Sequence, residues 1–472
     1  MEAADAGNYR QVTKLAGAVQ PWRYGEGRSM TMAGRVDGGQ SSRAGRRARR
    51  LLATVVAATV VQCGCVAAAQ AAPGDFFTYD DSGIAEYAAG SVLDTRTLSY
   101  HLAGLPVPVT AIQIRYRTTD AQGRPASNIT TVLLPPGPRR AGAAVSYQSF
   151  YDSLNPADSP SRAVAGGVSL GQLVNTAEGF YVAQLLARGL PVLLPDTEGQ
   201  QADFAAGPEY GYTTLDSIRA AAQVEGTGID GGTRIGLLGY SGGAIATNWA
   251  AALAPSYAPE VDEQLAGAAE GGVLVDPARN LLYVDGSVGW AGVAGMAIVG
   301  VGRAYDIDFG PYLSAYAQRL LPRLESASIA NVLFQYPGLT WTQLVKPEYA
   351  DPQSVPPYAE VTRKINLGTA PTPTVPMFIG QAANGVLEGT DGSRAGIGPG
   401  DAVMVAGDVR ALARRYCADG NSAVDYVEYG PLSHITAAPL AMQAEIDWLD
   451  HRLAGEPAPS TCGSIPPGNS IG

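Results

Sequence analysis

The clearest chemical signal in the chain is the segment Gly239-Tyr240-Ser241-Gly242-Gly243, which reads G-x-S-x-G. A short apolar run over residues 233–238 leads into it, and small residues at helical spacing come after it. Glycines on both sides of a serine let a strand turn sharply into a helix and hold the hydroxyl at the tip of that turn. The pattern therefore predicts a nucleophile elbow with Ser241 as the nucleophile.

A second match, Gly167-Val168-Ser169-Leu170-Gly171, shows how weak the motif is by itself in a chain with 58 glycines. Loop-like residues rather than a strand precede it, so we interpret Ser169 as a loop or helix-capping serine. The structural alternative for Ser241 is a tight strand-to-helix turn packed with small residues. A base and an acid that serve Ser241 would decide between a nucleophile and a simple turn.

The base is sought among the three histidines, because a serine nucleophile needs a base within hydrogen-bond reach. Around such an elbow the order along the chain is serine, acid, histidine. His434 lies in a short loop between the last predicted strand and the last predicted helix, where the base belongs. His451 falls within that helix and is expected at the surface, and His101 precedes the strands that could carry the site. We therefore predict His434 as the base; the alternative is a loop histidine with a structural hydrogen bond.

The acid should come after the strand predicted over Val375–Gly380. Asn384 is nearest but uncharged, and residues 385–400 have the composition of a flexible, glycine-rich surface insertion. Asp401 comes directly after this insertion and leads into a predicted helix, which restores the loop-to-helix geometry. We predict Asp401 as the acid and keep Asp391 as the alternative.

An oxyanion that forms on a substrate needs two preorganised N–H donors. The residue after the nucleophile, Gly242, supplies one of them in this type of turn. The other is expected from the loop after the strand at Ala143–Ser146, which points to Asp152 or a neighbour. Chemistry alone leaves a helix-capping or turn-capping role for Asp152 open as well.

The elements around these residues alternate between strands and helices. An antiparallel hairpin is expected first, from two runs rich in β-branched residues, Thr110–Tyr116 and Ile129–Leu134. Later strands are predicted at Ala143–Ser146, Pro191–Leu194, 233–238, Gly271–Val275, Val375–Gly380 and Val424–Tyr429. Helices are predicted at Tyr181–Arg188, Thr213–Val224, Ala406–Tyr416 and Pro439–Leu453. This alternation predicts an α/β class fold, with a mostly parallel sheet and helices on both faces, of the α/β-hydrolase type.

The alternation stops after residue 275. The next stretch holds small apolar residues and a predicted helix over Tyr312–Leu324, broken by Pro322. We predict a mainly helical cap or lid over residues 276–370, inserted between two parts of the core. These core parts are residues 72–275 and 371–472. An ordinary α/β core with decorated loops is the alternative.

Residues 1–71 are predicted to be a leader and secretory signal peptide. Arginines precede an apolar run from Leu51 to Ala69, and Ala69-Gln70-Ala71 forms a small-x-small cleavage pattern. Cleavage is expected after Ala71, which makes the protein secreted. A membrane anchor is the alternative, since the run is nearly long enough to span a bilayer.

Charge and cysteine content narrow the possible functions. The chain has a formal net charge of −11, and removal of residues 1–71, with ten basic and four acidic residues, leaves −17. Such an acidic domain lacks the positively charged surface that binding of nucleic acid requires. Cleavage also leaves only Cys417 and Cys462, which in an exported protein are expected to form a disulfide. No histidine pair has metal-ligand spacing, so no metal site is predicted.

With these residues assembled, the chain resembles the secretory lipase family of fungi and actinobacteria. The matching segments are Val145-Ser146-Tyr147-Gln148, Asp152-Ser153, Pro195–Gly199, Leu215–Ala220, Gly239–Gly243 and Ala269–Gly272. The resemblance implies an α/β-hydrolase core, a helical lid inserted late, and hydrolysis of esters of acyl chains. By position it implies a triad of Ser241, Asp401 and His434, and an oxyanion hole of the Asp152 and Gly242 amides. The chain departs from the family pattern at residues 385–400, where an insertion separates the strand from the acid.

The sequence thus predicts a secreted serine lipase or esterase that acts on acyl glycerols or similar lipids through an acyl-enzyme and needs no cofactor. Its expected partners are a lipid or small ester substrate and, transiently, a lipid–water interface. An acyltransferase and a secreted serine peptidase are alternatives on the same fold. A non-catalytic, hydrolase-like binding protein is the alternative from another class, and intact Ser241 and His434 argue against it.

Overall fold

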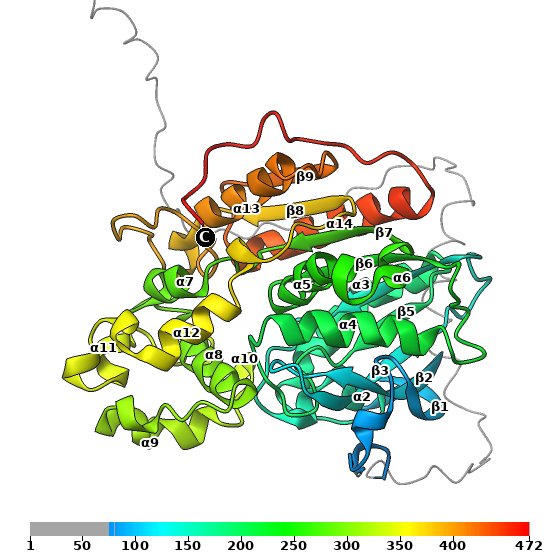
Figure 1. Ribbon diagram of the computed structural model, residues 1–472, viewed down its shortest axis with the longest axis horizontal. Coiled ribbons are helices and arrows are strands. Elements are labelled where there is room, and N and C mark those ends of the chain that lie inside the picture. Colours follow the sequence, from blue (N-terminus) through cyan, green and yellow to red (C-terminus); the bar gives the residue numbers. More distant parts are fainter. Residues whose placement is uncertain (1–74, 80, 472) are drawn as a thin grey trace, which may run out of the picture. The chain divides into compact units, whose positions relative to one another are not determined.

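A mixed sheet runs through the centre of the fold (Figure 1). The structure is a computed structural model that describes residues 75–79 and 81–471, so the predicted signal peptide over residues 1–71 lies outside the described residues. Nine strands of the described chain form the sheet, in the order β1-β2-β3-β5-β4-β6-β7-β8-β9. Their bounds are Val92–Leu102 (β1), Leu105–Thr119 (β2), Pro125–Leu133 (β3), Ala143–Gln148 (β4), Val192–Pro195 (β5), Arg234–Tyr240 (β6), Leu265–Gly271 (β7), Met377–Ala382 (β8) and Val424–Tyr429 (β9).

The sheet is antiparallel at one edge and parallel over the rest of its width. Strands β1, β2, β3 and β5 pair antiparallel in that order, which includes the predicted early hairpin of β2 and β3. Strands β5, β4, β6, β7, β8 and β9 are parallel neighbours. Parallel strands are normally covered on both faces, and every residue of β4, β7 and β8 is accordingly buried.

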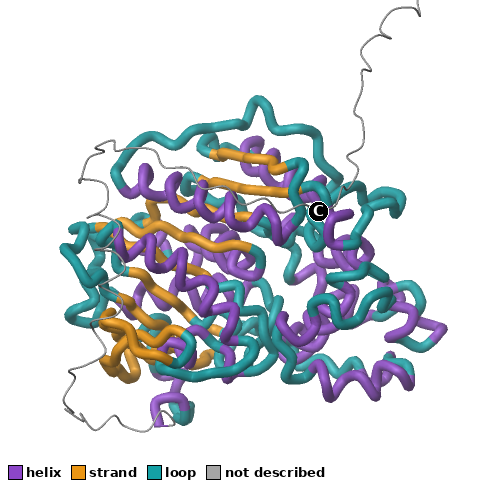
Figure 2. The backbone as a smooth tube through the Cα atoms, turned by 180° about the vertical axis from the view of Figure 1, so that it is seen from behind, coloured by secondary structure: helices purple, strands orange, loops and turns teal. Residues whose placement is uncertain are grey.

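Helices cover both faces of the sheet, as predicted (Figures 1 and 2). One face packs against α4 (Pro208–Ala221), α5 (Gly242–Tyr257) and α13 (Ala406–Ala418). The other packs against α3 (Gln172–Ala187) and α14 (His434–Leu453). Neighbouring residues of a strand point to opposite faces, so Leu237 joins the first core and Leu238 the second.

The chain between β7 and β8 folds into helices that have a hydrophobic core of their own. We call these elements the cap helices: α7 (Pro277–Val284), α8 (Ala291–Ala304), α9 (Ala315–Leu324), α10 (Ile329–Val332), α11 (Trp341–Leu344) and α12 (Pro356–Lys364). Met296 of α8 and Leu320 of α9 lie in this core. Phe204 and Met404 join it from loops that come after β5 and β8, so the cap helices pack onto loops at the carboxyl ends of the strands.

Two short helices, α2 (Pro160–Val164) and α6 (Pro259–Asp262), complete the α-helices of the described chain. None of the helices within residues 75–79 and 81–471 is both long enough and apolar enough to span a bilayer. Cys417 at the end of α13 and Cys462 in the C-terminal tail form a disulfide, as predicted. Ile465 of the same tail is buried against the α13 side of the sheet, so the tail is part of the fold.

Strand β7 lies earlier in the chain than the sequence indicated. The prediction chose the more apolar run Gly271–Val275, whereas the structure has the strand at Leu265–Gly271. Gly272 comes next with φ of 62°, a left-handed conformation that turns the chain out of the sheet. Apart from Leu265 and Glu270, the strand consists of alanine and glycine, and it carries no β-branched side chain. It forms a strand because it pairs with β6 and β8, and the sequence pattern alone does not reveal these pairings.

Two helices differ from the prediction at prolines. The last helix begins at His434 and passes through Pro439, because Ser433 caps its first turn and starts it earlier. Helix α9 likewise continues through Pro322, which lies in its last turn. A proline there removes one backbone hydrogen bond and leaves the preceding turns intact.

Candidate active site

Ser241 lies at the turn between β6 and α5, with φ of 56°. A residue other than glycine adopts this conformation rarely and only where the surrounding structure enforces it. The elbow glycines provide the room for it. A Cβ on Gly239 would lie 2.4 Å from the carbonyl oxygen of Gly243, and a Cβ on Gly243 would lie 2.1 Å from that of Gln148. The chain therefore makes the sharp strand–serine–helix turn that the motif predicted.

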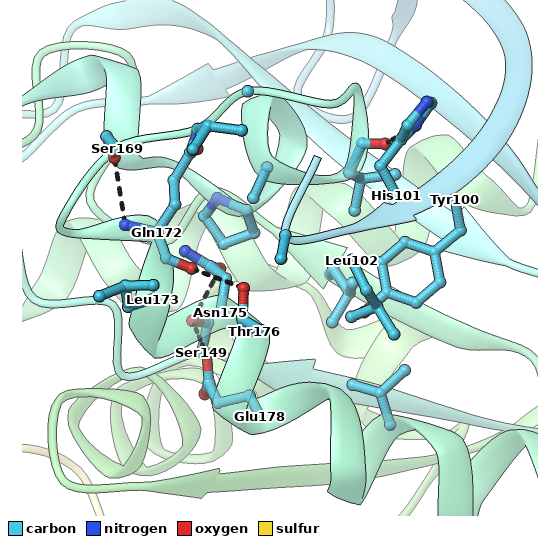
Figure 3. A pocket seen from close by; sticks show the side chains of 18 of the residues that line it. Tyr100, His101, Leu102, Ser149, Ser169, Gln172, Leu173, Asn175, Thr176 and Glu178 are labelled. Atoms are coloured by element: carbon cyan, nitrogen blue, oxygen red, sulfur yellow. Dashed lines mark hydrogen bonds between the residues drawn. The ribbon is translucent and has the colours of Figure 1, made fainter. Parts of the chain in front are cut away.

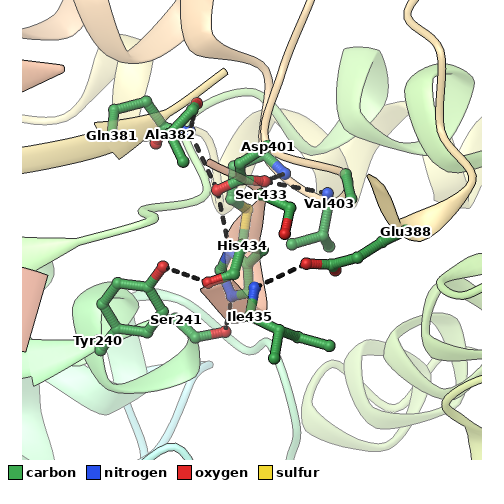
Figure 4. Close-up of polar contacts among 12 residues, drawn as sticks. Tyr240, Ser241, Gln381, Ala382, Glu388, Asp401, Val403, Ser433, His434 and Ile435 are labelled. Atoms are coloured by element: carbon green, nitrogen blue, oxygen red, sulfur yellow. Dashed lines mark hydrogen bonds and ion pairs between the residues drawn. The ribbon is translucent and has the colours of Figure 1, made fainter. Parts of the chain in front are cut away.

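Ser241, His434 and Asp401 form a continuous hydrogen-bonded series (Figure 4). Nε2 of His434 lies 2.8 Å from Oγ of Ser241, and Nδ1 of His434 lies 2.8 Å from Oδ2 of Asp401. The backbone N–H of His434 also donates to the Asp401 carbonyl oxygen, at 2.7 Å. The three residues come after β6, β8 and β9, and parallel strands bring the loops at their carboxyl ends to the same edge of the sheet. All three side chains are buried.

Asp401 is held by donors on both of its carboxylate oxygens. Oδ1 accepts from two backbone N–H groups of the next turn, at 3.0 and 2.7 Å. Oδ2 accepts from Nε2 of Gln381, at 3.0 Å, in addition to its bond with His434. Asp391, the alternative acid, is exposed and accepts from a backbone N–H two residues later. The structure therefore brings Asp401, and not Asp391, to the histidine.

The surroundings of His434 favour its protonated form. Burial lowers the pKa of its imidazole, but the charge of Asp401 and its hydrogen bond raise it, and the charge of Glu388 adds to that effect. The net result is a pKa above the ordinary value for histidine. A histidine with these neighbours is a stronger proton acceptor toward the Ser241 hydroxyl than an isolated imidazole.

Asp152 lies directly against the start of α5. A Cβ on Gly242 would be 1.8 Å from Oδ1 of Asp152, so this contact requires glycine. The backbone of Asp152 is in the left-handed region, with φ of 37°, and its carbonyl oxygen accepts from the N–H of Ile329 in α10, at 2.8 Å. Burial and the charge of Glu178 raise the pKa of Asp152 to about 8, although His434 lowers it. The two residues predicted for the oxyanion hole are thus neighbours, and burial favours the neutral form of Asp152.

An apolar cavity of about 60 Å³ lies beside Ser241. Its lining includes Phe204, Leu274, Val284, Val293, Ala297 and Met404. It shares Leu274 and Ala294 with a second cavity of about 70 Å³. The second cavity in turn shares Ile298 and Phe309 with a third of about 540 Å³, between α8, α9 and α11. Residues of helix α8 therefore line all three cavities.

A buried glutamate that the sequence analysis missed, Glu178, lies beside Ser149 in the segment that leads to Asp152 (Figure 3). Glu178 of α3 accepts hydrogen bonds from the hydroxyls of Tyr147 and Ser149, at 3.0 and 2.5 Å, and from the N–H of Phe150, at 3.0 Å. Burial raises its pKa to about 7, against the lowering by these donors. Glu178 thereby fixes the residues that lead from β4 to Asp152. No motif marks it in the sequence.

Most of the insertion over residues 385–400 is exposed, as its composition predicted, but the segment is anchored to the site. The N–H of Gly385 donates to the carbonyl oxygen of Gly400, at 2.8 Å, so the insertion is closed at its base. Glu388 within it is only 6 % exposed and contacts the site (Figure 4). The sequence missed Glu388 because an acid among glycines is normally a surface residue.

The remaining candidates lie outside this group. Ser169 lies in the loop before α3, in line with its interpretation as a loop or helix-capping serine, and its Oγ accepts from the N–H of Gln172, the first residue of that helix, at 3.1 Å. His451 is exposed and contacts Glu456. Nδ1 of His101 lies 3.0 Å from a backbone carbonyl oxygen in α2.

A mostly parallel sheet covered on both faces, a strand–serine–helix turn, and an aspartate and a histidine after later strands define an α/β hydrolase. A family model described as secretory lipase matches residues 167–461. The chain belongs to the secretory lipase family and is a carboxylic ester hydrolase of the lipase type.

Individual relatives match over most of the chain. A probable inactive lipase of Mycobacterium tuberculosis, MT1628, is 30% identical over 391 residues, which cover 81% of this chain and 82% of that protein. The secreted triacylglycerol lipase LIP7 of Malassezia globosa is 28% identical over 413 residues, 82% of this chain and 81% of that protein. The closed state of Candida antarctica lipase A superposes with a TM-score of 0.73 at 24% identity, covering 86% of this chain and 91% of that chain. The last likeness concerns the fold.

Proposed function

We propose that the protein is an exported serine lipase or esterase that hydrolyses esters of acyl glycerols or similar lipids through an acyl-enzyme. The series Ser241–His434–Asp401, with 2.8 Å at each step, is the observation that carries this proposal. Family membership gives the class of reaction. The series supports the assignment of residues to that reaction.

In the first half of the reaction, Nε2 of His434 takes the proton of the Ser241 hydroxyl while Oγ attacks the ester carbonyl carbon. A C–O bond forms, and the carbonyl electron pair moves onto the oxygen. Asp401 holds the Nδ1–H of His434 and stabilises the imidazolium. The backbone N–H groups of Gly242 and Asp152 donate to the oxyanion, and the neutral side chain of Asp152 adds no repelling charge there.

In the second half, the imidazolium of His434 gives its proton to the leaving alcohol as the ester bond breaks, which leaves the acyl group on Ser241. Water then attacks the acyl carbon and His434 accepts its proton. Collapse of this second intermediate releases the fatty acid and returns the proton to Oγ of Ser241. Every proton in this scheme moves between Ser241, His434, the leaving alcohol and water.

We place the acyl chain of the substrate in the apolar cavities along α8, and we regard residues 276–370 as the cap that supplies them. The cavity beside Ser241, at about 60 Å³, has room for only a few waters, and the third, at about 540 Å³, is much larger. A short acyl group needs only the first cavity. A long chain needs passage along α8 into the others.

The test is hydrolysis of p-nitrophenyl butyrate and p-nitrophenyl palmitate by the chain that begins at Ala72, beside Ser241→Ala. We expect both esters to be cleaved and the variant to lose at least about 10³-fold in kcat, as removal of a triad nucleophile does elsewhere. Cleavage of butyrate alone would restrict the proposal to a short-chain esterase. Full activity of Ser241→Ala would contradict the proposed nucleophile.

A non-catalytic protein on a hydrolase scaffold is the second candidate, because one relative at 30% identity is named a probable inactive lipase. A phosphonate that reacts with activated serines separates the two. Labelling at Ser241 supports the hydrolase. Absence of both labelling and ester hydrolysis would favour the binding protein.

Export is also part of the proposal. The Cys417–Cys462 disulfide suits an oxidising compartment, and the family is described as secretory. N-terminal sequencing of the secreted protein should find Ala72 as the first residue. A membrane-bound protein that still carries the residues before Ala71 would favour the membrane anchor instead.

A further inference from the structure

A second buried carboxylate, besides Asp401, contacts the element that carries the histidine. Glu388 ends the short helix η8 (Gly385–Glu388) in the inserted segment. Its Oε1 accepts from the backbone N–H of Ile435, at 2.8 Å, and its Oε2 accepts from the indole N–H of Trp290, at 2.7 Å. No lysine or arginine of the described chain forms an ion pair with it. Its two oxygens are therefore committed to two neutral donors.

Each of these two donors belongs to a residue next to His434, Ile435 in the chain and Trp290 in space. Ile435 is the next residue along α14, and its N–H is one of those at the helix start that have no partner within the helix. A carboxylate at this position also interacts favourably with the helix dipole. The first contact of Glu388 thus fixes the turn on which the imidazole is mounted.

The second contact fixes a ring that packs on the imidazole itself. Trp290 immediately precedes the cap helix α8, and its ring meets the His434 ring edge to face, with centroids 5.2 Å apart and an angle of 83° between planes. The hydrogen bond to Glu388 holds the indole in this orientation. Glu388 therefore joins three parts of the chain: the insertion, the cap helices and the start of α14.

Two backbone hydrogen bonds hold the loop around Glu388 in place. The N–H of Thr390 donates to the carbonyl oxygen of Gly385, at 3.0 Å, which closes a tight loop around Glu388. The N–H of Val288 donates to the carbonyl oxygen of Gly389, at 3.2 Å, and ties this loop to the turn before Trp290. The inserted segment and the turn before α8 thus support each other.

We propose that Glu388 is a positioning residue, which holds the imidazole of His434 at hydrogen-bonding distance from Ser241 through its contacts with Ile435 and Trp290. Because Trp290 leads into α8, the geometry of proton transfer then depends on how the cap helices pack against the core. The inference rests on the proposed function and deepens it. Glu388 touches neither substrate nor the reacting atoms in this scheme. Its carboxylate also lies close enough to His434 to favour the imidazolium.

The main variant is Glu388→Gln, which keeps the shape of the side chain but removes its charge and one of its two acceptors. We expect kcat for p-nitrophenyl butyrate to fall roughly 10-fold to 100-fold with KM little changed, because a small misplacement of a catalytic group has effects of that size. The acid limb of the pH profile of kcat/KM should move to lower pH, since the imidazolium loses a nearby negative charge. The exposed Glu348→Gln on the cap side is the matched control and should behave as wild type.

Trp290→Phe is the second variant, which keeps an aromatic edge against His434 and removes the indole N–H. It should lower kcat while the acid limb stays in place, because the charge of Glu388 remains. Comparison of the two variants separates the effect of the Glu388 charge from the effect of its hydrogen bond to Trp290. It also keeps the proposal testable if Glu388→Gln fails to fold.

A titration of the histidine rings by NMR reports on the proposal independently of activity, because the chain has only three histidines. We expect the pKa of His434 to fall in Glu388→Gln. A wild-type protein that hydrolyses no ester would overturn the proposed function, while this shift would still show that Glu388 acts on His434. An unchanged kcat together with an unchanged His434 titration in Glu388→Gln would overturn the positioning role. A lower melting temperature with both unchanged would make Glu388 purely structural.

Discussion

At the scale of single residues, two aspartates approach the Ser241–His434 pair in different ways. Asp401 accepts from backbone N–H groups and Gln381, and these bonds aim its carboxylate at Nδ1 of the imidazole. Asp152 lies against Gly242, where burial raises its pKa to about 8. In the proposed reaction, Asp401 orients the base, and Asp152 in its neutral form adds no charge where negative charge develops on the substrate.

We predict that activity declines as the pH rises above about 8, because Asp152 then becomes negatively charged beside the proposed oxyanion. Below that pH the side chain is neutral, so Asp152→Asn should keep most of kcat there and lose the alkaline decline. The measurement is kcat/KM for p-nitrophenyl butyrate against pH, corrected for spontaneous hydrolysis. Asp391→Asn, at an exposed acid away from the site, is the control. The same alkaline limb in wild type and Asp152→Asn would contradict this role.

The contact between Ser241 and His434 could be predicted because the elbow is a local pattern and the chain has only three histidines. Asp401 could be placed because the segment after it leads into a helix, α13, which begins at Ala406. Glu388 and Glu178 could not be predicted, since the burial of an acid depends on which distant segments pack over it. For Glu388 those segments are the turn before α8 and the start of α14.

At the scale of elements, the turn from β6 into α5 is specified by contacts between backbones. Gly243→Ala would put a Cβ 2.1 Å from the carbonyl oxygen of Gln148 in β4, a backbone atom of a central strand. Overpacking of this kind costs about 1–3 kcal/mol or more. We predict a clear fall in melting temperature and loss of most ester hydrolysis, measured by thermal unfolding and by the p-nitrophenyl butyrate assay.

Gly231→Ala is the matched control, because position 231 lies in the turn before β6 with nothing within 4 Å of an added Cβ. It should retain both stability and activity. If Gly243→Ala matched it in both measurements, the close contact between the elbow and β4 would not be required.

Some strands can be predicted from their sequence pattern alone, and others cannot. Strand β9 has the predicted bounds, Val424–Tyr429, because its alternating β-branched and aromatic residues match a half-buried edge strand. Strand β7, Leu265–Gly271, lacks such residues and is buried throughout. Its neighbours in the sheet hold it in place, and those neighbours come from distant parts of the chain.

At the scale of the whole molecule, the excess of acidic residues extends into the core. Four buried carboxyl groups have pKa values raised mainly by burial to about 7 or 8: Asp152, Glu178, Asp203 and Glu270. Each group binds its proton more tightly in the folded chain than in the unfolded chain, where carboxyl pKa values are about 4. Their contribution to stability is therefore complete below about pH 4 and is lost as the pH rises through about 7 to 8.

We predict that the melting temperature of the wild type is higher at about pH 5 than at about pH 8, in line with this linkage. Glu270 offers a direct test, because it is fully buried and accepts one bond from Nδ2 of Asn248, at 2.6 Å, which a glutamine carbonyl could also accept. Glu270→Gln should match the wild type at the lower pH and exceed it at the higher one, since the folded variant no longer holds an ionisable group there. The exposed Glu263→Gln should leave the pH dependence unchanged. A wild type that melts at the same or a higher temperature at about pH 8 would mean that these carboxyl groups do not bind their protons more tightly in the folded chain.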